Sequence, residues 1–311
     1  MYSSTVFVRG EFTFFFHKFI MLYSNIQYFC LMKFRIKAVL SYDVYTSSTC
    51  IFNIQALENS RIQKIISESL EIAPQLPFKQ FSLPESKIRF ITVQANEFVP
   101  FKISYQGEIE VEFKIINKET LIKNTSIFDL DNKIVPYLSP SRLCPSDKLM
   151  KLSFKLFGYL QSDIEKAVAV NDWIFNNVDY VPGTTDASTS AYDTLNQREG
   201  VCKDFAHLGI ALCRALNIPA RYFTCYATNI NPPDIHACFE VYIGGQWILF
   251  DPTRLSDLSS LVKIAHGKDG SDVAVANLFG NASCTYMNIE CEKLNGDSNP
   301  LYASDDFFIS Y

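Results

Sequence analysis

The chain lacks several features that would assign it to a functional class at once. None of its nine cysteines belongs to a C-x-x-C pair, so we expect no zinc site, and nothing else in the sequence predicts a metal or a cofactor. Its formal net charge of -5 provides no basic excess for binding nucleic acid. It has neither an internal repeat nor a low-complexity tract. These absences leave the functional argument to individual residues.

The cysteines also indicate a compartment. They are odd in number and scattered, at positions 30, 50, 144, 202, 213, 225, 238, 284 and 291. Such scatter suits a reducing cytoplasm, where thiols stay free and a catalytic thiol survives. The length of 311 residues is enough for two domains, and the hydrophobic content of 48% can supply a core for each. We therefore expect a two-domain cytoplasmic protein.

The first 31 residues carry an aromatic and apolar patch between Phe12 and Ile20, interrupted by a histidine and a lysine. The patch is too short and too broken for a stable membrane span, and it lacks a small-residue cleavage site. A secretory signal sequence stays open as the alternative. We expect residues 1–31 to be a non-native extension, with translation starting at Met32.

Cys202 lies where a helix is expected to begin. Apolar residues recur at intervals of three and four from Phe205 to Leu216, which is typical of one face of a helix. Pro219 ends this pattern, and Gly200 allows a turn just before it. The unpaired N–H groups and the dipole at a helix N-terminus favour a thiolate, and they can stabilise an oxyanion. Cys202 is therefore a candidate nucleophile.

Two partners for this thiol lie on a predicted hairpin. An alternating strand begins at His236, a Gly-Gly turn follows at residues 244–245, and a second strand returns to Asp251. If Ile243 pairs with Gln246, His236 becomes the diagonal neighbour of Asp251, at a distance of roughly 7–8 Å. The spacing thus allows Asp251 to orient His236, but it does not show that the pair reaches the thiol.

Several motifs together resemble the bacterial transglutaminase-like superfamily. They are the segments at residues 200–206, 217–222, 236–237 and 247–253, in that order. The resemblance covers residues 145–290, and the segment from Met32 onward is similar to the β domain that often precedes this core in bacteria. It implies an α+β fold, in which a papain-like transglutaminase core follows an antiparallel β domain.

The resemblance also implies a catalytic triad. Cys202 would be the nucleophile, His236 the general base and acid, and Asp251 the group that orients the histidine. One departure is Cys238, where relatives often carry Trp, and we expect it to change the wall of the substrate groove. His207 lies five positions after Cys202, about 140° around the helix. We interpret His207 as a packing or hydrogen-bonding residue.

Alternation of apolar and polar residues dominates residues 32–140, which predicts a β-sandwich-like domain. Within it we expect an antiparallel hairpin between Phe101 and Ile115, with the turn at Gly107. A run with three prolines at residues 136–145 then marks a linker.

The catalytic domain is expected to comprise residues 141–311. Its predicted helices run from Ser146 to about Leu156, from Ser162 behind a capping box with Glu165, and from Ser190 to Gln197. We expect two later strands, at residues 273–278 and 284–289, to finish the core sheet, and the tail from Asn295 to be weakly ordered.

The predicted chemistry is cysteine-dependent acyl transfer on an amide bond through a thioester. Water as the acceptor gives hydrolysis by a protease or amidase, and an amine gives transamidation. The triad is common to both, so the sequence leaves both open. An arylamine acetyltransferase is a weaker option, and a non-catalytic protein-binding module on the same core is the alternative from another class. The expected partner is a protein or peptide amide substrate.

Overall fold

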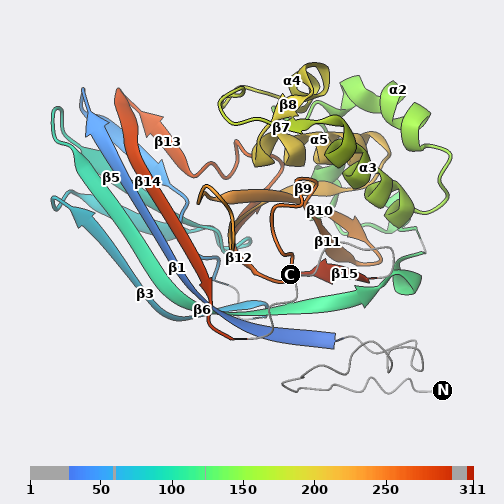
Figure 1. Ribbon diagram of the computed structural model, residues 1–311, viewed down its shortest axis with the longest axis horizontal. Helices are drawn as coiled ribbons and strands as arrows, with labels where there is room; N and C mark the ends of the chain where they lie inside the picture. Colours follow the sequence, from blue (N-terminus) through green and yellow to red (C-terminus); the bar gives the residue numbers. More distant parts are fainter. Residues whose placement is uncertain (1–27, 59–60, 123, 296–306) are drawn as a thin grey trace.

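The computed structural model describes residues 28–58, 61–122, 124–295 and 307–311 (Figure 1). It confirms an α+β fold, with a β-sheet unit on the left of the view and a core that carries the helices on the right. The strands of the β-sheet unit are β1 (Tyr28–Val44), β2 (Ser48–Phe52), β3 (Gln63–Ala73), β4 (Phe78–Ser82), β5 (Arg89–Ala95), β6 (Phe101–Asn117), β13 (Ala276–Phe279) and β14 (Ala282–Lys293).

The core follows after three short 3-10 helices, Lys118–Leu121, Ile127–Asp129 and Val135–Leu138. Its elements are α2 (Ser146–Phe157), α3 (Asp163–Asn177), β7 (Asp179–Tyr180), α4 (Ala191–Gln197), β8 (Glu199–Gly200), α5 (Cys202–Ala215), β9 (Ala220–Ala227), β10 (His236–Ile243), β11 (Gln246–Phe250) and β12 (Leu261–Gly267). The last strand, β15 (Phe307–Ser310), joins the sheet of β6. The three predicted helices are confirmed, and α3 has the expected capping box between Ser162 and Glu165.

The β-sheet unit is a sandwich of two antiparallel sheets. One has the strand order β14-β1-β6-β15, with β3 also on β6, and the other has the order β13-β2-β5-β4. Every second residue of β6 from Phe101 to Phe113 is buried, as the alternation predicts. The rings of Tyr42, Phe52 and Phe101 pack together and connect the two sheets. The predicted β-sandwich is therefore present.

The expected hairpin at Gly107 is wrong. Strand β6 runs without a break and pairs with β1 on one side and β3 on the other. Gly107 lies beside a register shift of β3 between Ile65 and Ser67, where an added Cβ would come within 2.9 Å of the Ser67 carbonyl oxygen. The glycine thus permits a close backbone approach within one long strand rather than a turn.

The core is a four-stranded antiparallel sheet with the order β11-β10-β9-β12, and its helices lie above it in Figure 1. Helix α5 is buried almost throughout. At Gly209 an added Cβ would lie 2.6 Å from the ring of Phe239 on β10, so the glycine lets the helix approach the sheet closely. This contact fixes the height of α5, and hence of its first residue, above the sheet.

The strands that follow the core correct two expectations. They do not finish the core sheet, because β13 pairs with β2 and β14 pairs along β1. The expected division between residues 140 and 141 is therefore crossed by the returning chain. Residues 307–311 were expected in a weakly ordered tail, but β15 pairs with β6, and Phe308 and Tyr311 are buried. Residues 296–306 of that expected tail lie outside the described residues.

Strand β1 also begins earlier than expected. Residues 28–31 pair with β6, starting with Tyr28 opposite Ile115, so they belong to the sandwich rather than to an extension. The aromatic patch from Phe12 to Ile20 lies outside the described residues.

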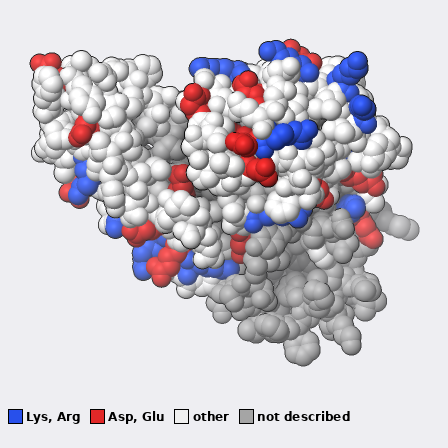
Figure 2. Space-filling view, turned by 45° about the horizontal axis from the view of Figure 1, so that its top comes forward, with Lys and Arg blue, Asp and Glu red and all other residues white. Residues whose placement is uncertain are grey.

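In the part of the chain that the structure describes, no helix has the length and apolarity needed to cross a membrane. On the face shown in Figure 2, acidic and basic side chains are interspersed and neither sign forms a broad field.

Candidate active site

Cys202 is the first residue of α5, as predicted. Val201 before it is extended, and its backbone N–H donates to the Asp204 carboxylate at 2.9 Å. That buried carboxylate also accepts from the Thr185 hydroxyl at 2.6 Å and pairs with Lys203. Asp204 thus ties the start of the helix to the loop that precedes it. Cys202 as a whole residue retains slight exposure, at 9%.

The hairpin of β10 and β11 has the predicted register. Ile243 lies opposite Gln246 and Phe239 lies opposite Phe250, so Asp251 follows directly where β11 ends. The turn residues Gly244 and Gly245 have φ values of 61° and 81°, a backbone conformation that glycine adopts without strain.

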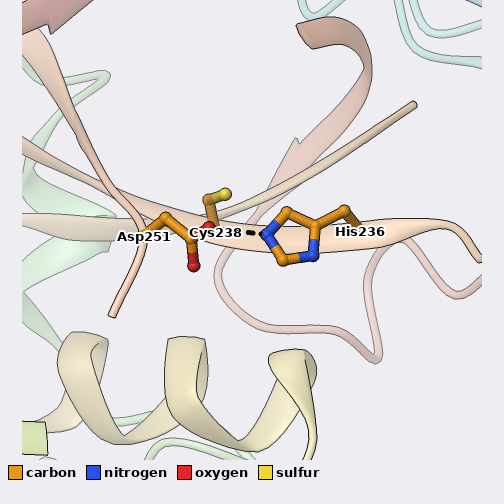
Figure 3. Close-up of side chains that lie close together, drawn as sticks. All are labelled: His236, Cys238 and Asp251. Atoms are coloured by element: carbon orange, nitrogen blue, oxygen red, sulfur yellow. Dashed lines mark hydrogen bonds and ion pairs between the residues drawn. The ribbon is translucent and has the colours of Figure 1, made fainter. Parts of the chain in front are cut away.

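The pairing brings His236 and Asp251 together, with His236 Nε2 at 2.9 Å from Asp251 Oδ2 (Figure 3). Both side chains are buried. The diagonal contact expected from the hairpin spacing is therefore confirmed.

Asp251 is held at both of its oxygens. Oδ1 accepts from the backbone N–H and the hydroxyl of Thr253, at 3.0 and 2.6 Å. Oδ2 accepts from the backbone N–H and the hydroxyl of Ser256, at 3.2 and 2.8 Å, in addition to its contact with His236. Burial alone would raise the pKa of Asp251, but His236 and these donors outweigh it and lower that pKa below its usual value. The side chain is therefore an ionised acceptor in a fixed orientation.

His236 also contacts the candidate nucleophile. Burial alone would lower the pKa of His236, but the Asp251 carboxylate and a hydrogen bond with the Cys202 thiol help to hold it well above its usual value. Because Nε2 faces Asp251, Nδ1 is the ring atom left for the thiol. In Figure 3 the second ring nitrogen of His236 is directed away from Asp251. The structure thus brings together the three residues that the sequence analysis selected.

A fourth side chain lies at this site, Tyr180, which the sequence did not predict. Strand β7 pairs in parallel with β8 and sets Tyr180 beside Gly200, two residues before Cys202. The backbone of Cys202 hydrogen-bonds to the phenol oxygen, and burial raises the pKa of Tyr180 to about 12. The phenol therefore stays protonated near neutral pH. A two-residue strand leaves no periodic signal, so the spacing of residues did not predict this contact.

Cys238 corrects the expectation about the substrate groove. Its side chain is fully buried, so it lines no groove wall. It lies beside the His236 and Asp251 side chains, and the three potential metal-ligand atoms are within 4.8 Å of one another. Burial raises the pKa of the Cys238 thiol well above its usual value. This is the one group among the described residues whose spacing would suit a metal ion.

His207 has the packing role that the sequence analysis assigned to it. Its ring stacks on Tyr222 with a centroid distance of 4.9 Å, and Nε2 accepts a hydrogen bond from the Gly270 backbone. Burial lowers the pKa of His207 to about 4, so the ring is neutral near pH 7. His207 is thus fixed within the core by contacts of its own.

A cavity of about 270 Å³ adjoins the site, between the loop after β9 and strand β14. Asp234, two residues before His236, lines it on one side, and Glu290 and Glu292 line it on the other. Burial raises the pKa of Asp234. The cavity lies where the core meets the sandwich, so both units contribute to the surroundings of the site.

Comparisons with known proteins give one result for both units. Residues 151–252 match the family model of the transglutaminase-like superfamily, and residues 32–133 match that of the bacterial transglutaminase N-terminal domain. A crystal structure of a candidate cysteine protease from Cytophaga hutchinsonii is 47% identical, with a TM-score of 0.89. That match covers 92% of this chain and 99% of the other.

Curated relatives are more distant. An uncharacterised protein of Mycobacterium leprae is 26% identical over 56% of this chain, and one of Mycobacterium tuberculosis is 29% identical over 42%. The matched segments span 64% and 47% of those proteins, so the chain covers less than two thirds of either relative.

Proposed function

The chain belongs to the transglutaminase-like superfamily, and on that premise we propose that it is a cysteine-dependent enzyme acting on amide bonds of proteins or peptides. Cys202 is the nucleophile, His236 the general base and acid, and Asp251 the residue that orients His236. The likeness to a candidate cysteine protease supports peptide-bond hydrolysis as the first reaction to test. Transfer of the same acyl group to an amine is its counterpart.

One observation carries this proposal, namely the hydrogen-bonded series from Asp251 through His236 to Cys202. Asp251 fixes one ring nitrogen at 2.9 Å, and the Cys202 thiol hydrogen-bonds to the same ring. A carboxylate, an imidazole and a thiol in that order allow a proton to leave the sulfur and return to a leaving amine.

The reaction then proceeds in two halves. The sulfur of Cys202 attacks the carbonyl carbon of the amide while its proton passes to Nδ1 of His236. The tetrahedral intermediate collapses as His236 protonates the leaving amine, and a thioester to Cys202 remains. In the second half His236 takes a proton from water or from an amine, which attacks the thioester and releases the thiol. The carboxylate of Asp251 stabilises the imidazolium at each stage.

Two groups can stabilise the oxyanion of that intermediate. One is the backbone N–H of Cys202, which points outward from the helix start. The other is the Tyr180 hydroxyl, which already hydrogen-bonds to the backbone of Cys202 and stays protonated. In the free protein the phenol oxygen occupies the donor that the oxyanion needs, so the substrate oxygen must displace it. Once displaced, the hydroxyl can donate to the same oxyanion.

Thiol labelling tests the proposal without knowledge of the substrate. Cys284 is exposed and serves as the matched control for access, whereas Cys213 is a buried thiol on the same helix as Cys202. An ordinary free thiol is less than about 1% ionised at pH 6, so iodoacetamide reacts with it slowly. We expect Cys202 to react at pH 6 at least roughly tenfold faster than Cys284, and a His236→Ala variant to lose that advantage.

Mass spectrometry of each cysteine-containing peptide measures these rates. If Cys202 reacts no faster than Cys284, or if its rate does not depend on His236, the protein is better described as a non-catalytic binding module. A peptide library with and without an added amine then distinguishes hydrolysis from transamidation. The nine free thiols support a reducing compartment as the place of this activity.

A further inference from the structure

Cys238 has no part in the proposed reaction, yet it lies against the two residues that orient the imidazole. It is two residues after His236 on β10, and it is one of three fully or nearly fully buried side chains in this group. Figure 3 shows its sulfur near the Asp251 end of the imidazole, and its thiol hydrogen-bonds to that of Cys225. A sulfur, a nitrogen and an oxygen ligand are thus presented to the same small volume.

The spacing of these three atoms is close to that of the ligands around a bound zinc ion. In a tetrahedral zinc site the bonds are about 2.0–2.3 Å long, which places sulfur and nitrogen ligands roughly 3.5 Å apart. Here the three ligand atoms lie within 4.8 Å of one another, and Nε2 and Oδ2 are already 2.9 Å apart. Movements of about 1 Å at the sulfur would therefore bring these three atoms to the spacing of zinc ligands and fill three of the four positions of a tetrahedral site.

We propose that His236, Cys238 and Asp251 form a binding site for a divalent cation of the zinc class, and that the bound cation blocks the enzyme. The blocking part rests on the proposed function, whereas the binding part does not. The absence of C-x-x-C pairs predicted no zinc site, but that rule does not cover ligands at positions i and i+2 of a strand with a third from the neighbouring strand end.

The proton balance explains why the cation would block the reaction. Binding removes the thiol proton of Cys238, so a thiolate becomes a ligand and the proton goes to solvent. A neutral His236 must present the lone pair of Nε2, so its ring proton moves to Nδ1. Nδ1 then carries a hydrogen and can no longer take the proton of Cys202. The cation also replaces the hydrogen bond between Asp251 and His236 that orients the ring.

Cobalt is the probe, because a cobalt–thiolate bond gives an absorption band that neither ligand-free cobalt nor the protein has. Chelator-treated full-length protein is titrated with Co²⁺, and Zn²⁺ is then added in competition. We expect a saturable thiolate band in the wild type that Zn²⁺ abolishes, since zinc binds such ligands more tightly than cobalt. Cys202→Ala and Cys213→Ala should keep the band, whereas Cys238→Ala should lose it and bind the cation roughly 10-fold or more weakly.

The results separate this proposal from the simpler one of a cation on the nucleophile. Absence of a band in the wild type would overturn the proposal, and so would a band that Cys202→Ala removes and Cys238→Ala retains. Melting curves check that Cys238→Ala is folded, and Cys238→Ser serves as the second variant because its hydroxyl can still hydrogen-bond to Cys225.

Labelling of Cys202 then tests the block. We expect Zn²⁺ to slow it at least roughly tenfold in the wild type and much less in Cys238→Ala, each relative to its own zinc-free rate. Equal slowing in both would refute the block. If Cys202 is unreactive even without metal, the proposed function fails, and the cobalt titration still decides on the site.

Discussion

In an Asp251→Asn variant, the new amide must fit a place where every neighbour donates a hydrogen bond. At Oδ2 the donors are His236 Nε2 at 2.9 Å and the hydroxyl and N–H of Ser256 at 2.8 and 3.2 Å. At Oδ1 they are the N–H and the hydroxyl of Thr253 at 3.0 and 2.6 Å. Hydroxyl groups can turn to accept, but backbone N–H groups cannot.

Either orientation of the asparagine therefore leaves a conflict. With the amide nitrogen toward Thr253, the backbone N–H of Thr253 faces another donor, while His236 keeps its proton on Nε2. With the amide nitrogen toward His236, the backbone N–H of Ser256 loses its acceptor, and the ring must take the other tautomer. For catalysis the two orientations differ. The first removes only the carboxylate charge, whereas the second removes both the charge and the productive tautomer of His236.

The magnitudes follow from these two conflicts. A buried N–H without an acceptor costs about 1–3 kcal/mol of stability. The matching change in a serine triad lowers turnover by about 10⁴. A cysteine enzyme loses less, because a thiolate–imidazolium pair can form without the carboxylate. We expect a loss in turnover on the order of 10² or more, equivalent to about 2.7 kcal/mol, in a variant that is folded but less stable than the wild type.

The pH dependence gives a second readout. Burial lowers the pKa of His236, and Asp251 is the main group that opposes it, so the His236 pKa falls in the variant. The basic limb of the kcat/KM profile should then move to lower pH. The wild type should also be more stable than the variant over a limited pH range. This difference in stability should shrink as pH rises through the pKa of His236, which is raised above the usual 6.5. It should also shrink as pH falls through the pKa of Asp251, which is lowered below the usual 3.8.

Thr253→Val is the matched control, because it removes the hydroxyl bond to Oδ1 and keeps the backbone N–H and the His236 contact. The lost bond to an ionised carboxylate is worth about 1.5–3 kcal/mol of stability. We expect turnover to change less than roughly tenfold, because the Thr253 N–H and both Ser256 donors still hold the carboxylate in place for His236. Turnover on a peptide found by screening, measured from pH 4 to 10 alongside melting temperatures, decides the matter. Asparagine at position 251 with turnover within about threefold of the parent and an unmoved basic limb would refute the reasoning and leave a Cys–His dyad.

Two further changes test the surroundings of the triad. Tyr180→Phe removes the hydroxyl and keeps the ring, and we expect kcat to fall about 10- to 10³-fold with little change in melting temperature; unchanged or faster turnover would show that the phenol only obstructs the site. Phe308→Ala removes a buried ring that packs on Phe250, and we expect it to cost about 3–5 kcal/mol in chemical unfolding, whereas Phe128→Ala, at a 95% exposed position, should cost less than about 0.5 kcal/mol. Equal costs for the two would mean that β15 contributes little to stability.

The parts of the fold that the sequence predicted are those with local signals. Helix α5 has an apolar stripe and a glycine before it, and α3 has a serine cap with glutamate three residues later. The hairpin has a Gly-Gly turn that fixes its register, and the contact of His236 with Asp251 follows from that register. Each signal spans fewer than about twenty residues, within the range over which spacing alone determines contacts.

The errors concern contacts between distant segments or the meaning of a single glycine. Nothing in the local sequence of β13 and β14 indicates that these strands return to β2 and β1. At Gly107 the spacing did contain an answer. The buried residues on both sides of it, Tyr105 and Ile109, have the same parity, so the alternation continues through the glycine. A turn would have allowed that parity to change.

The return of the chain to the sandwich gives the N-terminal unit a part in holding the catalytic residues. Phe308 of β15 packs on Phe250, directly before Asp251, with a centroid distance of 5.9 Å. The ring centroid of Tyr311 lies 5.8 Å from the ring centroids of both Phe113 of β6 and Phe223 of β9. These rings are buried and continuous with the core beneath the sheet. The end of β11 that presents Asp251 therefore packs on two elements, namely its neighbour β10 in the core sheet and β15, which belongs to a sheet of the sandwich. A core expressed without the sandwich would lose the partner of β15, and with it the packing behind Asp251.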